Sequence, residues 1–179
     1  MKHPLENTWT FWYQKNDPNV NWEQQMKQIV DVATIEDFWA VFNHLESASN
    51  LQEGQDYSLF KKGIIPDWSD VQNTKGGRMI VNMEPKQHLE QRARRERLDW
   101  LWLELLLVLI GEQAREHSNQ CNGATLNVKK RADRLSVWLR SAADLEGIRE
   151  VGGRVKAALR LRQGQVYFQV SGLLLKFMF

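Results

Sequence analysis

The sequence predicts an α+β fold, in which a mainly antiparallel sheet is backed on one face by helices. Short stretches rich in aromatic and β-branched residues are interspersed with longer stretches of helical periodicity, and their spacing favours hairpins over β–α–β units. The chain has 179 residues, of which 42% are hydrophobic and 26% are charged, so it is long enough to bury a substantial core. We therefore expect a single domain over residues 1–179.

The first elements are a strand, a turn and a helix. TWTFWYQK (8–15) alternates aromatic or β-branched residues with polar ones, which is typical of a strand. KNDPNVNW (15–22) is turn-forming sequence that ends on a tryptophan. We expect a helix within 34–45, capped by Thr34, with its apolar residues at helical spacing: Ile35, Phe38, Trp39 and Phe42.

Two strands and a long helix are expected in the middle of the chain. SLFKKGIIPDW (58–68) predicts a short strand that enters an irregular loop, and GGRMIVNM (76–83) predicts another. A helix is expected from about 89 to 110, closed by Gly111 at the C′ position. Its first half, EQRARRER (90–97), should be solvated and its second half buried.

The last third predicts a hairpin, a helix and a strand. GATLNVKK (123–130) and RLSVWLR (134–140) should pair across a short basic connection. Residues 144–161 are largely helical in pattern, and QVYFQV (165–170) is a further strand. The chain then ends in a hydrophobic tail, within SGLLLKFMF (171–179).

Charge, cysteine content and hydropathy limit the class of protein. The formal net charge of +2 predicts no global attraction for nucleic acid, so any basic site must arise from local clustering. The single cysteine, Cys121, excludes an intramolecular disulfide and fits a reducing compartment. The start lacks an apolar signal region, and the apolar run 101–110 contains Glu104 and is too short to span a bilayer. We expect a cytoplasmic or nuclear protein with no membrane association.

No pattern of catalytic or metal-binding residues stands out. The four histidines are scattered, and there is no HExxH or CxxC motif to hold zinc. GGR (76–78) lacks the lysine and hydroxyl residue of a phosphate-binding loop, and neither a GxSxG motif nor a marked carboxylate pair is present. We therefore expect a binding protein that is not an enzyme and has no cofactor or metal.

The eight tryptophans are roughly three times the number that average composition would give. Trp22 and Trp68 lie in loop-like sequence, where two indoles could clamp a planar base and each contribute about 1–3 kcal/mol of stacking. Basic residues could hold phosphates beside that base: Arg78 and the turn residues Lys129, Lys130, Arg131 and Arg134. On pattern alone, burial in the core remains the commoner role for Trp39 and Trp138, and solvation the commoner state of a basic turn.

Seven stretches resemble the eukaryotic translation initiation factor 4E family, which binds the mRNA cap. They are KHPLENTWTFWYQKND (2–17), NW (21–22), TIEDFWAVFNHL (34–45), DYSLFKKGIIPDW (56–68), GGR (76–78), LWLELLLVLIGE (101–112) and the GATLNV…W spacing (123–138). The resemblance runs in order from Lys2 to about Val170. It implies a curved antiparallel sheet with helices packed on its convex face and the cap bound on its concave face.

The resemblance also implies roles for individual residues. Trp22 and Trp68 would sandwich 7-methylguanine, whose positive charge favours electron-rich indoles, and Trp138 would lie near the methyl group. The phosphate chain would be held by charged donors, namely Arg78, Lys129 and Arg134. The other tryptophans, Trp9, Trp12, Trp100 and Trp102, are expected in the core.

The chain also departs from the family pattern. Ser69 stands where the family has a glutamate that accepts both N–H groups of the guanine edge, and we expect a ten- to thousandfold loss of affinity (about 1–3 kcal/mol or more) unless Asp70 replaces it. Lys129 replaces the usual arginine and loses its bidentate fork, and Met79 replaces a tryptophan as a packing change. The tail 171–179 replaces a polar loop that bears a phosphorylated serine, and would either pair as a surrogate strand or lie exposed.

A second site is implied on the convex face, for partner helices of the form Tyr-x-x-x-x-Leu-hydrophobic, which scaffold and 4E-binding repressor proteins carry. The spacing agrees, because residues i and i+4 on each of two helices would form adjacent apolar stripes with a groove between them. The matching residues are His3, Pro4, Ile35, Trp39, Leu103, Glu104 and Leu107.

Two functional hypotheses follow. The first is a cap-binding translation initiation factor that recruits a scaffold protein through the convex groove. The alternative is a cap-impaired isoform that sequesters scaffold or repressor partners and so regulates translation. Ser69, together with the departure from the family pattern in the terminal segment 171–179, separates them. A cap-directed hydrolase has no support among the acidic residues or histidines.

Overall fold

The computed structural model describes residues 2–88, 90–171 and 176–178. Its strands are β1 (Pro4–Lys15), β2 (Met26–Thr34), β3 (Gln55–Lys61), β4 (Gly77–Asn82), β5 (Cys121–Asn127), β6 (Arg134–Leu139), β7 (Val166–Val170) and β8 (Lys176–Met178). Its helices are α1 (Trp22–Gln25), α2 (Ile35–Phe42), α3 (Val71–Thr74), α4 (Gln91–Ile110) and α5 (Leu145–Ala158), with 3-10 turns η1 (Ala48–Asn50), η2 (Lys86–His88) and η3 (Arg115–Gln120).

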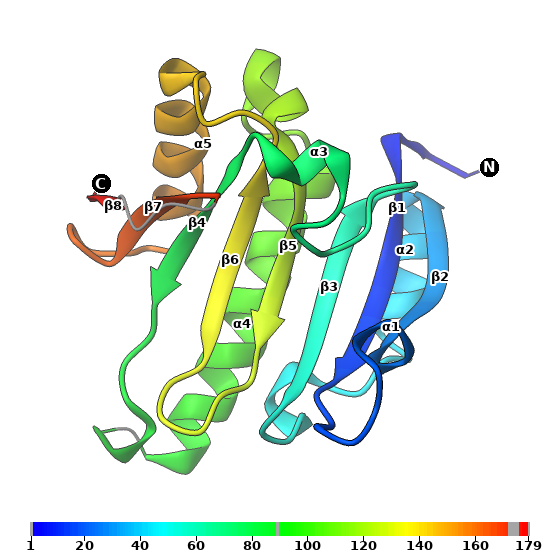
Figure 1. Cartoon of the computed structure of the whole chain (residues 1–179), viewed down its shortest axis with the longest axis vertical. Coiled ribbons are helices and arrows are strands. Elements are labelled where there is room, and N and C mark those ends of the chain that lie inside the picture. Colours follow the sequence, from blue (N-terminus) through cyan, green and yellow to red (C-terminus); the bar gives the residue numbers. More distant parts are fainter. Residues whose placement is uncertain (1, 89, 172–175, 179) are drawn as a thin grey trace.

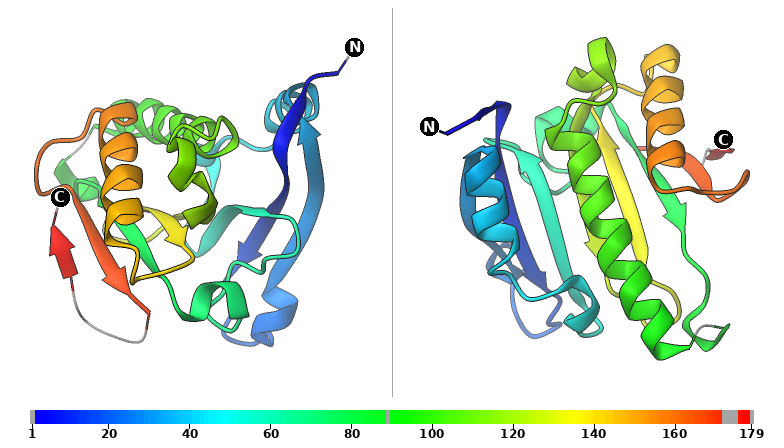
Figure 2. Two further views of the ribbon diagram at one scale, coloured as in Figure 1. Left: turned by 90° about the horizontal axis from the view of Figure 1, so that it is seen from above. Right: turned by 180° about the vertical axis from the view of Figure 1, so that it is seen from behind.

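All described strands belong to one antiparallel sheet, in the order β2-β1-β3-β5-β6-β4-β7-β8 (Figure 1). The long helices α2, α4 and α5 pack on one face of this curved sheet, whereas α1 and α3 lie on the other side (Figure 2). The predicted α+β class, with helices on the convex face, is confirmed. β5 and β6 form the predicted hairpin, with Thr125 opposite Ser136.

Alternation along the strands divides the apolar residues between two faces. The helix-side core contains strand residues such as Phe11, Leu59, Met79, Val137 and Phe168, together with the buried stripe of α4. Burial of Met79 in this core fits its expected role in packing. A second, smaller cluster of Phe60, Ile64 and Trp138 lies on the opposite face, and Trp68 packs against it. This side of the sheet carries only the short helices α1 and α3, and we call it the helix-free face because no long helix covers it; it presents the rings of this cluster to a ligand.

The start of α2 follows the predicted capping pattern. The Thr34 hydroxyl accepts a hydrogen bond from the Asp37 backbone N–H at 3.1 Å. The helix ends at Phe42, three residues short of the expected limit. Ile35 N also donates to the carbonyl of His3 at 2.9 Å, so the first residues of the chain are attached to this helix.

Strand β2 and helix α1 were not predicted. β2 lies at the edge of the sheet, and Val32 is its one fully buried residue. A strand that buries so little needs no regular alternation of apolar and polar residues, so its sequence gave little sign of a strand. Pairing with β1 organises it nevertheless, for example where Thr10 lies opposite Asp31. Trp22, expected in a turn, instead begins the single-turn helix α1.

The end of α4 corrects the role predicted for Gly111. The helix ends at Ile110, but Gly111 has φ −85°, and the left-handed backbone falls on Glu112 at φ 49°. A glycine is required at 111 by close approach, because a Cβ there would lie 2.7 Å from the Leu107 carbonyl oxygen.

Of the four tryptophans expected in the core, Trp9 and Trp102 are fully buried there. Trp100 is half-buried at the rim of the core, with the Arg160 guanidinium 5.6 Å from its ring centroid. The prediction for Trp12 is wrong, because it alternates with core residues of β1 and so lies on the helix-free face.

The C-terminal tail forms a strand where the structure describes it. β8 pairs antiparallel with β7, placing Phe177 opposite Phe168, so residues 176–178 act as the surrogate strand that was one of the two expected alternatives. The rest of the tail, 172–175 and 179, lies outside the described residues. Among the described residues, no helix combines the length and apolar character needed to cross a membrane.

Candidate functional site

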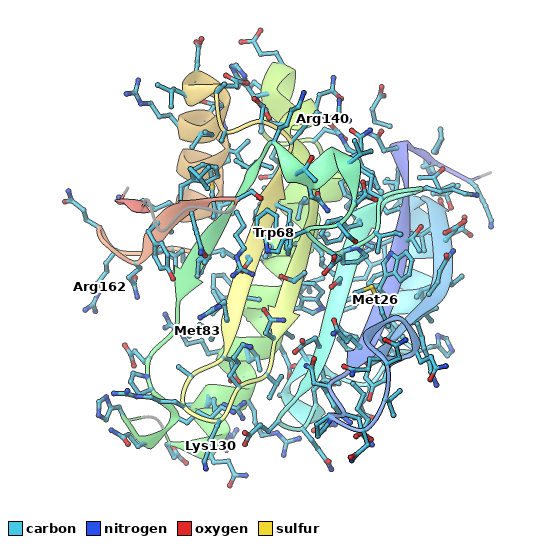
Figure 3. The ribbon with its side chains drawn as sticks, viewed as in Figure 1. Met26, Trp68, Met83, Lys130, Arg140 and Arg162 are labelled. Carbon is cyan, nitrogen blue, oxygen red and sulfur yellow. The ribbon has the colours of Figure 1, made fainter. Side chains whose placement is uncertain are left out.

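An aromatic cluster on the helix-free face forms the centre of the candidate site. The ring centroids of Trp68 and Trp138 lie 4.2 Å apart, and Phe60 packs edge-on against Trp138 at 5.8 Å. Trp138 is buried, and its indole N–H donates to the Thr125 hydroxyl at 3.3 Å. Figure 3 shows Trp68 over the middle of the sheet, on the side turned away from α4. Trp138 is thus a fixed floor, and Trp68 is the half-exposed ring above it.

The loop that carries Trp68 is held by its own polar side chains. Asp70 caps α3 by accepting from the Gln72 N–H at 2.8 Å, and its other oxygen accepts from the Ile65 N–H at 2.7 Å. The buried Asn73 amide donates to the carbonyls of Ile65 and Asp67 at 3.0 and 2.8 Å. The loop shape therefore depends on internal hydrogen bonds rather than on apolar packing alone.

Ser69 lies at the exposed tip of this loop. Its backbone N–H donates to Asp67 Oδ1 at 2.8 Å, and its side chain is exposed. Both carboxylate oxygens of Asp70 accept backbone N–H groups of the loop, so turning this carboxylate toward a ligand would break those two hydrogen bonds.

Arg78 on β4 places a cation beside the two indoles. Its guanidinium carbon lies 5.7 Å from the ring centroids of both Trp68 and Trp138, and its nitrogens donate to Gln169 Oε1 at 3.4 Å. Burial lowers the pKa of Arg78, and the positive charge of Arg134 lowers it further. No carboxylate pairs with Arg78 among the described residues, so its charge is available to an anionic ligand.

The basic turn between β5 and β6 is fixed by one buried acid. Asp133, with a side chain only 2% exposed, accepts from Arg94 at 2.6 and 2.9 Å and from Lys86 at 3.1 Å. It also accepts from the Lys129 backbone N–H at 3.3 Å. Asp133 thus neutralises the charges of Lys86 and Arg94, which lie outside the turn. It contacts Lys129 only through the backbone, and the side chain of Lys129 is exposed.

The structure brings together several of the residues expected at this site. Trp68, Arg78 and Trp138 are in mutual contact, and Arg134 lies on the same face as Trp138, four residues along β6. The side chain of Trp22 lies outside what the structure describes. Sequence reasoning missed the supporting residues Asn73, Asp133 and Gln169. The single acid within the basic stretch KKRADR was the available signal for Asp133.

The second set of expected residues lies on the convex face. Ile35 is 44% exposed, and the half-buried Trp39 packs on Phe38 and Phe42 at ring-centroid distances of 5.3 and 6.0 Å. His3 and Pro4 are exposed beside the start of α2.

A carboxylate attaches the N-terminal segment to α2. Glu36 accepts hydrogen bonds from the His3 backbone N–H at 2.9 Å and pairs with His3 Nδ1 at 2.6 Å. These two bonds lower the pKa of Glu36 to about 2. The contact fixes the position of His3 next to Ile35.

Helix α4 contributes the other side of this surface. Leu103, Glu104 and Leu107 are half-buried, whereas their neighbours Leu101 and Leu105 are fully buried. A cavity of about 350 Å³ separates the end of α2 from α4, lined among others by Phe42, Leu45, Trp100 and Leu103. The two helices therefore leave accessible apolar residues on the same convex face (Figure 2).

Comparison with known proteins decides the family. The family model described as eukaryotic initiation factor 4E matches residues 4–173. The chain belongs to the initiation factor 4E family. Its relatives within the family include eukaryotic translation initiation factor 4E of Aplysia californica, 44% identical over 159 residues that cover 89% of this chain and 71% of the relative.

Solved members of the initiation factor 4E family share the fold closely. Ascaris suum eIF4E-3, solved with the m2,2,7G cap, has a TM-score of 0.89 at 38% identity and covers 98% of this chain and 96% of its own. Caenorhabditis elegans eIF4E-3, solved with the 4E-binding protein Mextli and a cap analog, has a TM-score of 0.88 at 35% identity, and the match covers 99% of this chain and 100% of the relative.

Residues 2–88, 90–171 and 176–178 contain no cluster of three or more His, Cys, Asp or Glu that could hold a metal ion.

Proposed function

We propose that this chain binds the 7-methylguanosine cap of mRNA and acts in the cytoplasm as a non-enzymatic translation initiation factor. The observation that carries the proposal is the contact of Trp68, Trp138 and Arg78 on the helix-free face of a fold that belongs to this family. The cap complexes among its structural relatives support it.

The base would be recognised by its charge as well as by its flat shape. Methylation at N7 makes guanine cationic, and a cation between two indoles gains attraction beyond ordinary stacking. Trp22 and Trp68 would supply the two rings, because each lies in a short segment on the helix-free side. The buried Trp138, fixed by Thr125, would form the wall near the methyl group.

The phosphate chain would be held by cations from two strands and a turn. Arg78 lies beside the indoles, Arg134 begins β6 on the same face, and Lys129 is exposed in the turn before it. Because these contacts are charge-assisted, affinity should rise with the number of phosphates and fall with added salt.

The convex face would bind helices of scaffold and repressor proteins that contain Tyr-x-x-x-x-Leu-hydrophobic. Ile35 and Trp39 on α2 and Leu103 and Leu107 on α4 leave partly exposed apolar surface, as a groove for an amphipathic helix requires. Glu104 adds a carboxylate to that surface, and His3 and Pro4 would contact the partner at the edge beside α2. Relatives solved with Mextli or 4E-BP support this assignment.

Quenching of tryptophan fluorescence tests the cap site directly. Titration with 7-methyl-GTP should quench the emission, GTP should bind far more weakly, and Trp68→Ala should abolish the response. Trp100→Phe is the matched control, because Trp100 is half-buried beneath the opposite face of the sheet and should leave binding unchanged.

A parallel measurement separates the two functional hypotheses. A Tyr-x-x-x-x-Leu-hydrophobic peptide should bind the wild-type chain and lose binding on Trp39→Ala, while 7-methyl-GTP binding persists. If the peptide binds but 7-methyl-GTP does not, the cap proposal fails and the partner-sequestering isoform takes its place.

A further inference from the structure

The basic turn between β5 and β6 contains two cations that the proposed cap site does not use. Lys129 and Arg134 lie at the two ends of the turn, and Lys130 and Arg131 lie between them. The side chains of Lys130 and Arg131 are exposed, and neither forms an ion pair with another residue in the described part of the chain. The outer surface of the turn therefore carries positive charge that can attract an anion.

The backbone of this turn is held in place by its neighbours. The Lys86 N–H donates to the Arg131 carbonyl at 2.9 Å, and Asp133 accepts from the Lys129 N–H at 3.3 Å. The buried Asp133 also pairs with Arg94 of α4 and with Lys86. Because the backbone is already ordered, the exposed cations lose less freedom on binding a ligand than cations of a loose loop would.

The position of the turn relative to the aromatic cluster gives a direction to any ligand that contacts both. Trp138 and Arg134 point to the same face of β6 and are four residues apart, which corresponds to about 13 Å along a strand. Figure 3 shows Lys130 at the end of the sheet that the turn closes, whereas Trp68 lies over the middle of the sheet. A phosphate chain that starts at the indoles and reaches Arg134 therefore arrives at the basic turn.

The residue types of the turn fit the backbone of single-stranded RNA. Lysine and arginine bind phosphates as charged donors, and such contacts carry no information about base sequence. The segment KKRADR (129–134) contains no aromatic residue on which a base could stack. The ligand that these side chains favour is a polyanion that continues from the cap phosphates.

We propose that Lys130 and Arg131 bind the RNA chain immediately downstream of the cap, through its phosphates and without sequence preference. The cap lies on the helix-free face, and the first nucleotides of the message cross the basic turn at the end of the sheet. This inference rests on the proposed cap-binding function and adds to it a contact with the body of the RNA.

Two ligands separate the RNA chain from the cap. One is the cap dinucleotide 7-methyl-GpppA, and the other is an RNA that continues this dinucleotide with eleven uridines. Each is titrated by tryptophan fluorescence at 50 and 200 mM KCl, against the wild type and against the double variant Lys130→Ala/Arg131→Ala. The advantage of the RNA is defined as its affinity divided by that of the dinucleotide.

The double variant Arg92→Ala/Arg95→Ala is the matched control. It removes the same charge from two exposed residues near the start of α4. Arg92 pairs with Glu96 on the same helix, and Arg95 donates to Asn50 of η1, so neither side chain contacts the basic turn through these bonds.

The wild type should bind the capped RNA more tightly than the dinucleotide at 50 mM KCl. Two additional phosphate contacts give an additional salt slope of about 1.4, so the advantage of the RNA should fall about sevenfold between 50 and 200 mM KCl. Lys130→Ala/Arg131→Ala should lower the advantage at 50 mM by about fivefold or more and remove this additional salt dependence. Arg92→Ala/Arg95→Ala should retain both.

The outcomes distinguish this inference from the function beneath it. Equal affinities of the wild type for the two ligands at 50 mM KCl overturn the inference and leave cap binding intact. Equal weakening of both ligands by Lys130→Ala/Arg131→Ala also overturns it, since the turn would then serve the cap phosphates alone. The same conclusion follows if the control variant loses as much of the advantage, because the effect would then be one of overall charge. If neither ligand binds the wild type, cap binding itself fails and the inference fails with it.

Discussion

Asp133 supports the basic turn that carries Lys129 and precedes Arg134. Its side chain is 2% exposed and accepts from Arg94 and Lys86, whose side chains are only 16% and 26% exposed. Replacing it by asparagine keeps the shape but leaves two poorly solvated cations without their counter-charge. Breaking a buried ion pair by removing one partner costs about 3–5 kcal/mol. We therefore expect Asp133→Asn to lower the free energy of unfolding by about 3 kcal/mol.

Glu96→Gln is the matched control for this prediction. It also removes one carboxylate from an arginine of α4, but the Arg92–Glu96 pair is 83% and 66% exposed and is spaced i, i+4. Such exposed pairs contribute about 0.3–0.5 kcal/mol. At roughly 2–4 °C per kcal/mol for a chain of this size, Asp133→Asn should lower Tm by about 6–12 °C and Glu96→Gln by about 2 °C or less.

Urea and thermal unfolding, followed by tryptophan fluorescence, measure both variants. If the two variants lose the same stability, the reasoning from burial is wrong. A second readout tests the link to the site: at a temperature where Asp133→Asn is folded, it should weaken 7-methyl-GTP more than 7-methylguanosine, because only the triphosphate depends on the turn.

Three further predictions concern other parts of the chain. Gly123→Ala should destabilise the fold by about 1–3 kcal/mol in urea unfolding, because a Cβ there would lie 2.4 Å from the ring of Phe60 on β3. Gly153→Ala is the control: a Cβ there has no atom within 4 Å, so this variant should be neutral or stabilising. Equal losses of stability in the two variants would contradict this prediction. The pKa of Glu36 is lowered to about 2 from 4.5, so its contact with His3 stabilises the folded chain above pH 4.5 and is lost as the pH falls toward 2; a carboxyl titration by NMR with a midpoint near 4.5 would refute it. Burial raises the pKa of Cys121 to about 12, so the thiol should resist alkylation at pH 8 in the folded chain and react after unfolding in urea, and rapid reaction of the folded protein would exclude this.

The order of most elements could be predicted because their signals are local. Thr34 caps α2 through a hydrogen bond to a residue three positions away, and the apolar half of α4 has no alternative to burial. Strand β2 escaped prediction because it is an edge strand with one fully buried residue, so its pairing with β1 leaves little pattern in its sequence. Trp12 was misassigned for a related reason: alternation tells which residues share a face, but not which face meets the helices.

The sequence by itself determined the chemistry that this protein can offer. It showed Trp22 and Trp68 in loop-like sequence, the basic turn, and a serine where the family carries a carboxylate, all of which are properties of residue type and short spacing. Only the tertiary structure decided which groups remain available. Asp70, which the sequence offered as a substitute acceptor, holds the loop with both carboxylate oxygens. Asp133, which sequence reasoning missed, is buried among cations from η2 and α4. Both outcomes depend on hydrogen bonds and ion pairs, some formed between segments distant in the chain, and on exclusion of water, which no local pattern records.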